Sequence, residues 1–131
     1  MSVEVGGSHL VVDSVTVNAT AVIYSNSLNL QSSKFFGLRI QCISASSTPD
    51  IKVEWESSND PPSTEGSSDT NYVVPDGLDS STDPIYANIT NEVWRTKQFF
   101  PSPSNYGRLK ITGNAANPSD TVVVAEIWLQ G

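Results

Sequence analysis

Histidine, cysteine and methionine are nearly missing from this 131-residue sequence, which contains one of each. Nucleophilic catalysis by Ser or Cys needs a base beside the nucleophile, and the single histidine, His9, lies near the start of the chain with no such constellation. The single cysteine, Cys42, cannot form an internal disulfide, so no oxidising compartment is implied. We therefore predict no catalytic residue, no metal ligand and no cofactor site.

Basic residues are also few, at seven against fourteen acidic ones, and the formal net charge is -7. A nucleic-acid binder needs Lys and Arg to displace counterions from phosphate, and an anionic membrane surface repels an acidic chain. No apolar run approaches the ~20 residues of a membrane-spanning helix. Residues 1–4 lack the basic and apolar segments that open a secretory signal. We expect no nucleic-acid partner, no membrane association and no secretory signal.

The sequence is rich in Ser, Thr and Asn, which together make up 40 of the 131 residues. These residue types disfavour helix interiors and are common in turns and strands. Apolar and polar residues alternate over 35–44 and 51–56, as expected of strands with one buried face. On the second of these, Ile51, Val53 and Trp55 form the apolar side, and we expect Glu54 and Glu56 to be solvated.

The pattern as a whole predicts a single domain over residues 1–131, an all-β antiparallel β-sandwich of jelly-roll type with seven or eight short strands. We interpret residues 15–23 as one half-buried strand and residues 106–113 and 121–130 as a hairpin with a long tip. Residues 1–12 are interpreted as an extended N-terminal arm. Residues 57–84, rich in Pro, Gly and Asp, are interpreted as a long acidic loop region.

Nine of the fourteen acidic residues lie between Val53 and Trp94, and no Lys or Arg lies among them. Loop carboxylates are suitable ligands for Ca²⁺, yet the spacing matches no known calcium loop. A solvated acidic loop and an electrostatic contact with a basic partner are the two other interpretations. The residues assigned to a candidate ligand or partner surface are Asp76, Asp79 and Asp83, with the aromatic residues Trp94 and Tyr86 as a candidate platform for stacking on sugars.

The last strand has apolar residues on both faces. Val123, Ala125, Ile127 and Leu129 alternate with a second set made of Val122, Val124 and Trp128. A strand in a single sandwich normally has one solvated side, so two apolar faces indicate cover by a loop or contact with another chain. We assign Val122, Val124 and Trp128 to a subunit or partner interface.

The C-terminal half resembles the closing strands of small β-sandwich proteins from tailed-phage virions, and the first half resembles their opening strands. The residues that carry this resemblance are Tyr106–Gly113, Asn114–Thr121 and Val122–Trp128, together with Ser27–Gln31, Phe35–Ile43 and Ile51–Asp60. The resemblance covers most of residues 15–130 and rests on the style of the pattern, with no diagnostic motif.

This resemblance implies a non-enzymatic virion structural protein, above all a capsid decoration or cement protein. Such a protein binds the outside of a shell of major capsid protein, or other virion proteins, as a homo-oligomer, for which a trimer is the expectation. It assembles in the host cytoplasm. The alternative is a carbohydrate-binding module, calcium-dependent or not, on a phage tail or receptor-binding apparatus.

Overall fold

Strands make up the regular secondary structure of the residues that the structure describes. The computed structural model describes residues 7–30, 33, 35–75, 84–99 and 104–130. Within these ranges there is no helix, and so none that is long and apolar enough to cross a membrane. The described strands are β1 (Gly7–Val17), β2 (Val22–Tyr24), β3 (Leu28–Asn29), β4 (Phe35–Ile43), β5 (Ile51–Ser58), β6 (Tyr86–Ile89), β7 (Arg95–Phe99), β8 (Tyr106–Gly113) and β9 (Thr121–Gln130).

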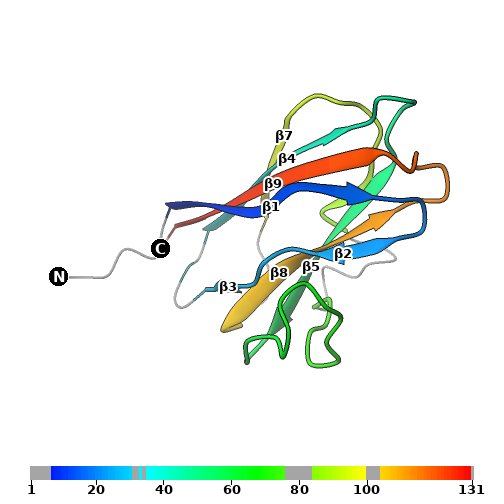
Figure 1. Cartoon of the computed structure of the whole chain (residues 1–131). Helices are drawn as coiled ribbons and strands as arrows, with labels where there is room; N and C mark the ends of the chain where they lie inside the picture. The colour runs from blue at the N-terminus through cyan, green and yellow to red at the C-terminus, as the bar shows by residue number, and fades with distance from the viewer. Residues whose placement is uncertain (1–6, 31–32, 34, 76–83, 100–103, 131) are drawn as a thin grey trace.

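Two antiparallel sheets pack against each other (Figure 1). Sheet A has the strand order β1-β9-β4-β7, and sheet B has the order β2-β8-β5-β6, with β3 also paired to β8. Counted from the two ends of the chain inward, the pairs are nested: β1 pairs with β9, β2 and β3 pair with β8, β4 pairs with β7, and β5 pairs with β6. The predicted all-β antiparallel β-sandwich is confirmed.

The core lies between the sheets and is built from the alternate residues that the sequence pattern singled out. Phe36, Leu38, Ile40 and Cys42 of β4 face Ile51, Val53 and Trp55 of β5, and all seven are buried. Trp55 contacts Phe36 and Phe99 edge-on, with ring centroids 5.8 and 5.3 Å away. Each buried side chain of this size contributes about 1.5–3 kcal/mol relative to its exposed state, so this layer holds the two sheets together.

The strand predicted over residues 15–23 is wrong, because the chain changes sheets within it. β1 ends at Val17 in sheet A, and β2 begins at Val22 in sheet B. Between them Thr20 has a φ of 60°, and the Ala21 amide donates to the Asn18 carbonyl. The left-handed residue makes the turn, and the alternation in the sequence continues across it by coincidence.

The hairpin predicted from residues 106–113 and 121–130 is also wrong. Both segments are strands, but β8 lies in sheet B and β9 lies in sheet A. The connection between them is fixed by Asn117, whose amide nitrogen donates to the Val17 carbonyl and whose amide oxygen accepts from the Asp50 amide and the Thr121 hydroxyl. These bonds tie three other segments to the connection and satisfy the buried amide as the chain crosses between sheets.

The described part of the expected N-terminal arm belongs to the sandwich. Residues 7–12 form the first half of β1 and pair with β9, from Gly7 opposite Leu129 to Val12 opposite Ala125. The register of β1 shifts between Leu10 and Val12 and again between Val12 and Val15. Ser14, inside the second interval, has a φ of 54°. Bulges of this kind bend and twist an edge strand, which disfavours pairing with another chain along that edge.

The region interpreted as an acidic loop, 57–84, begins inside β5, which continues to Ser58. Its described part then runs over residues 59–75, which we call the 59–75 loop. Within this loop Val73 forms a single bridge with Ser57. The rest of the region, 76–83, lies outside the described residues.

Candidate functional site

β9 lies in the middle of sheet A, between β1 and β4, and its two faces differ. Val123, Ala125, Ile127 and Leu129 point into the core and are at most 3% exposed. On the opposite side Val122 and Val124 are half-buried and Trp128 is 36% exposed. We call this side, together with the side chains aligned with it on β1 and β4, the outer face of sheet A.

The register of the strands defines the members of this face, because directly opposed residues in neighbouring strands share a face. Leu10 of β1 and Arg39 of β4 lie opposite Glu126, and Gly37 lies opposite Trp128. The members are Ser8, Leu10, Thr16, Phe35, Gly37, Arg39, Gln41, Ile43, Val122, Val124, Glu126, Trp128 and Gln130. Leu10 and Ile43 are 50% and 44% exposed, so an apolar surface faces solvent here.

The position of Trp128 depends on Gly37. A Cβ placed on Gly37 would lie 2.0 Å from the Trp128 ring, so the ring rests directly on the glycine backbone. The strand interior is an unfavourable place for glycine unless another group approaches closely. The sequence therefore provides a seat for the indole ring, which stays on the outer face with a defined orientation.

Arg39 lies between the exposed Trp94 ring and the carboxylate of Glu126. Its Nη1 lies 3.7 Å from Glu126 Oε2, and its guanidinium carbon lies 3.9 Å from the centroid of the Trp94 ring. Trp94 is 38% exposed and directly precedes edge strand β7. The Arg39 guanidinium, stacked on the Trp94 ring and paired with Glu126, is partly exposed and can contact a ligand or another protein.

Tyr86, the second candidate aromatic residue, has different neighbours from Trp94. It begins β6 in sheet B, is half-buried and packs against the core. Lys97 Nζ and Arg95 Cζ lie 5.2 and 5.1 Å from its ring centroid. Tyr86 therefore serves as a cation–π platform for the protein's own basic side chains, and the structure does not bring it together with Trp94 on one exposed surface.

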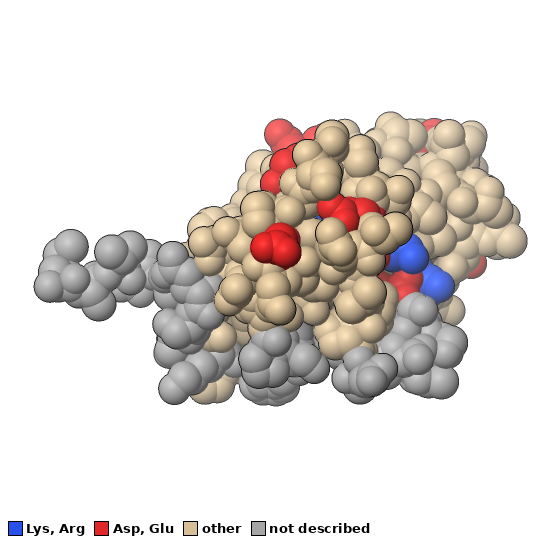
Figure 2. Space-filling view, turned by 90° about the horizontal axis from the view of Figure 1, so that it is seen from below, with Lys and Arg blue, Asp and Glu red and all other residues tan. Residues whose placement is uncertain are grey.

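The acidic residues of the described 59–75 loop, Asp60, Glu65 and Asp69, lie on the side of sheet B. Figure 2, seen from below relative to Figure 1, shows separate groups of Asp and Glu side chains on this face, one of them beside basic side chains. Amide groups of Ser63 and Asn71 donate to Asp69 and hold its pKa below the ordinary value. The candidate partner residues Asp76, Asp79 and Asp83 lie outside the described residues.

Glu54 and Glu56 are buried, at 1% and 7% exposed, so the expectation of a solvated strand face is wrong. The 59–75 loop supplies the cover. Arg108 of β8 donates from Nε to Glu56 Oε1 at 3.0 Å and from Nη1 to the Ser67 carbonyl at 2.7 Å. Alternation identified the shared face correctly, but it carries no information about a loop that folds back over that face.

Arg108 is the residue that sequence reasoning missed. Its guanidinium lies between the rings of Tyr24 and Tyr72, with the guanidinium carbon 4.2 and 4.5 Å from their centroids. Burial raises the pKa of the Glu56 carboxyl, and Arg108 opposes this effect through its hydrogen bond and charge. This arrangement fastens the 59–75 loop to sheet B. Alternation in β8 places Arg108 on the same face as Lys110 and Thr112, and so gave no signal that Arg108 is buried.

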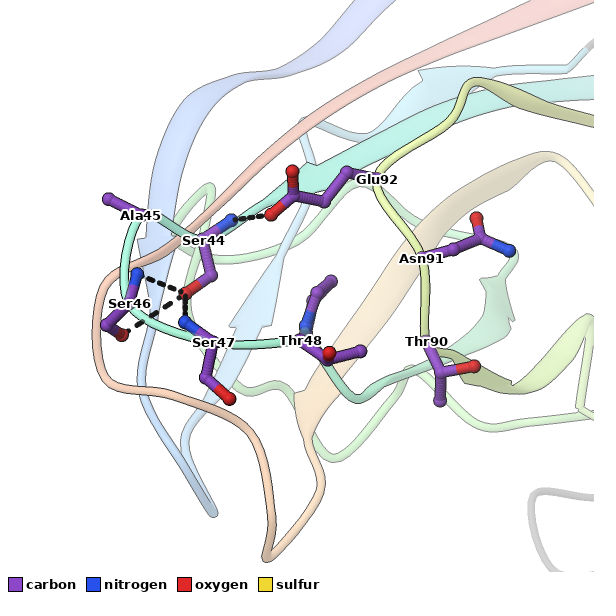
Figure 3. A pocket seen from close by; sticks show the side chains of 9 residues that line it. Ser44, Ala45, Ser46, Ser47, Thr48, Thr90, Asn91 and Glu92 are labelled. Atoms are coloured by element: carbon purple, nitrogen blue, oxygen red, sulfur yellow. Dashed lines mark hydrogen bonds between the residues drawn. The ribbon is translucent and has the colours of Figure 1, made fainter.

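A polar hollow of about 570 Å³ lies at one end of the sandwich, between residues 44–49 and 90–92 (Figure 3). Its lining is mostly hydroxyl and amide groups. The Ser44 amide donates to Glu92, and the Ser44 hydroxyl donates to Asp120 at 2.6 Å. Because Ser44 and Ser46 also donate to Asp120, the pKa of that carboxyl is lowered. These hydrogen bonds fix the two loops to each other.

The residues considered for catalysis lie in structural positions. Cys42 is fully buried in β4, and burial raises its pKa to about 12, so the thiol stays protonated. His9 lies in β1 opposite Ile127. Among the residues that the structure describes, no group of three or more His, Cys, Asp or Glu side chains is placed to hold a metal ion.

Comparison with known proteins adds no relative. No protein-family model matches this chain, and no curated protein matches it.

Proposed function

We propose that this protein is a non-enzymatic structural protein of a virion, which binds other virion proteins through the outer face of sheet A. The observation that carries the proposal is the exposure of the large apolar side chains Leu10, Ile43 and Trp128 on one side of sheet A. Large apolar side chains gathered on one exposed face are typical of contact sites. Tryptophan with a fixed orientation is also the residue type that most often anchors a protein interface.

The strand order supports the same proposal. If β2 and β3 count as one interrupted strand, the described residues form eight strands in nested antiparallel pairs, an arrangement typical of jelly rolls. Jelly rolls are frequent among viral capsid and lectin domains. This is support by analogy of fold, and the contact face carries the functional argument.

The specific role that we propose is capsid decoration. In this role the protein binds the outside of a shell of major capsid protein as a homo-oligomer, after synthesis in the host cytoplasm. The support is the resemblance of residues 15–130 to small virion β-sandwich proteins, together with the contact face. The loops of sheet B, with Asp60, Glu65 and Asp69, then point away from the contact and give the particle an acidic surface.

The test is cosedimentation of the purified chain with expanded shells assembled from the major capsid protein of the same genome. We expect saturable binding by the unchanged protein and its loss in Val124→Asp, which places a charge at the centre of the outer face of sheet A. The matched control is Val73→Asp, at an exposed valine of the 59–75 loop. Absence of binding to shells, or equal loss in both variants, would refute the proposal.

The second candidate function is carbohydrate binding, and one observation favours it. Trp94 and Trp128 are both more than a third exposed. Arg39 lies against the Trp94 ring, and Gly37, which contacts the Trp128 ring, is two residues before Arg39 on β4. Indole rings beside a fixed guanidinium are suitable for stacking on sugar rings. Glycan-array binding that is lost in Trp94→Ala and kept in Val93→Ala would establish this function. Repeating it with a chelator tests a calcium requirement.

A further inference from the structure

The outer face of sheet A carries two charges that match each other. Among the side chains that the register places on this face, Arg39 and Glu126 are the charged ones, and they lie directly opposite each other on β4 and β9. Their side chains are 41% and 31% exposed. An exposed ion pair of this kind adds little to the stability of one chain, so the pair is poorly explained by folding alone.

The apolar side chains surround this pair on the same flat surface. Leu10 lies beside Glu126 on β1, Val124 lies two residues before it, and Trp128 lies two residues after it. Trp128 rests on Gly37, so its ring reaches from β9 across to β4. A surface with apolar contacts around one balanced ion pair is complementary to a rotated copy of itself.

We propose that two copies of this chain pack outer face to outer face about a twofold axis that runs along the strands between β4 and β9. This rests on the contact face of the proposed function and names a second copy as the occupant of that face in the free protein; on a shell, the shell protein takes the place of that copy. The rotation places Arg39 of each copy over Glu126 of the other. It also brings the two Trp128 rings together near the axis, because each ring already lies above Gly37.

The charge distribution favours a copy of this chain as the occupant. A chain with a net charge of -7 can approach its own copy only through a neutral surface. In the face-to-face pair the two B sheets are the outermost layers, roughly 30 Å apart at a spacing of about 10 Å per sheet. The acidic residues of the two 59–75 loops are then separated by more than the Debye length of about 8 Å at physiological ionic strength.

The same geometry sets the number of subunits. A flat face that binds its own copy forms an isologous contact, which closes with two copies. The trimer implied by the resemblance needs two different patches on each chain. We therefore infer a dimer as the unit that this face forms.

Sedimentation equilibrium of the full chain tests the inference with charge reversals. Arg39→Glu and Glu126→Arg each place like charges opposite one another across the axis, and we expect each to raise the dimer dissociation constant at least tenfold. The double variant restores opposite charges and is expected to return the constant to within a few-fold of the original. Arg95→Glu is the matched control, because it changes the net charge equally at a residue that lies over Tyr86.

A chain that stays monomeric, a trimer mass, or a double variant as weak as the single ones would overturn the inference. The test separates it from the proposed function. A monomer that still binds shells through Val124 refutes the dimer alone, whereas a dimer that binds no shell refutes the virion role alone. Circular dichroism of each variant establishes that the fold is kept.

Discussion

The outer faces of the two sheets differ in the side chains that they carry and in whether a loop covers them. On sheet B the outward side chains include Glu56 and Arg108, and the 59–75 loop folds over them. On sheet A the outward side chains include Leu10, Val124 and Trp128, and they are exposed or half-buried. The charged outer side chains of sheet B are covered by a loop, whereas the apolar outer side chains of sheet A are in contact with solvent. This is the reverse of what solvation alone favours. This difference is the basis of our proposal that another protein covers the outer face of sheet A.

Two Arg–Glu pairs give the largest expected contrast between the faces. Arg108→Met leaves Glu56 buried without its cation, and removal of one partner of a buried ion pair costs about 3–5 kcal/mol. Arg39→Met removes the corresponding pair with Glu126 on the exposed face and costs at most about 1 kcal/mol. Urea unfolding at a concentration where the chain is monomeric measures both. Equal losses would mean that the 59–75 loop does not seal the face of sheet B.

Two glycines beneath tryptophan rings give the next contrast. A Cβ on Gly107 would lie 1.9 Å from the ring of Trp55, which is 1% exposed and has no free space to move into. Gly107→Ala should therefore cost about 1–3 kcal/mol or more through overpacking. Gly37→Ala meets Trp128 in the same way, but that ring can turn toward solvent. We expect a smaller loss of stability there.

The readout that separates the two glycine variants is association. Gly37→Ala should weaken the dimer, because it displaces the Trp128 ring from its seat, and tryptophan fluorescence of the monomer should shift as the ring moves. Gly107→Ala lowers stability without changing the dissociation constant of the folded chain. A Gly37→Ala variant that associates as tightly as the original would show that the seat of Trp128 is irrelevant to contact.

The smallest expected effects are pH dependences of opposite sign. Burial raises the pKa of Glu56 in the folded chain above its ordinary 4.5. The contribution of Glu56 to stability therefore falls as the pH rises from the ordinary pKa through the raised pKa of the folded state. The hydroxyls of Ser44 and Ser46 lower the pKa of Asp120, so its contribution is present above its ordinary 3.8 and is lost as the pH falls through the folded value.

Urea unfolding of Glu56→Gln and Asp120→Asn between about pH 3 and about pH 7 measures these two contributions. The free-energy difference from the unchanged chain should vary with pH in opposite directions for the two variants. Curves that run parallel to that of the unchanged chain would mean that neither carboxyl has a shifted pKa in the folded state.

Alternation in the sequence was sufficient to predict which residues form the core. It placed Phe36, Leu38 and Ile40 on one side of β4 and Trp55 on the same side of β5 as Val53, and all of these are buried. It works because strand side chains alternate strictly between two faces. For the same reason it placed Val124 and Trp128 on the face opposite the core.

Sequence could not predict what lies over the second face or which strands pair. Glu54 and Glu56 alternate as solvated residues do, yet Glu56 is buried beneath the 59–75 loop through Arg108, which also donates to the Ser67 carbonyl. β8 and β9 are neighbours in sequence, yet the bonds of Asn117 carry the chain to the other sheet. Both outcomes depend on contacts between distant segments, which a local pattern does not record.

The most direct test of the proposal that the outer face of sheet A is a contact face is hydroxyl-radical footprinting of the side chains. The protein concentration is raised through the range in which the chain associates. The account predicts that Leu10 and Trp128 on the outer face of sheet A become protected, while Val73 on the 59–75 loop keeps its reactivity. Unchanged reactivity of Leu10 and Trp128 in the associated protein, or protection of Val73 in their place, would contradict it.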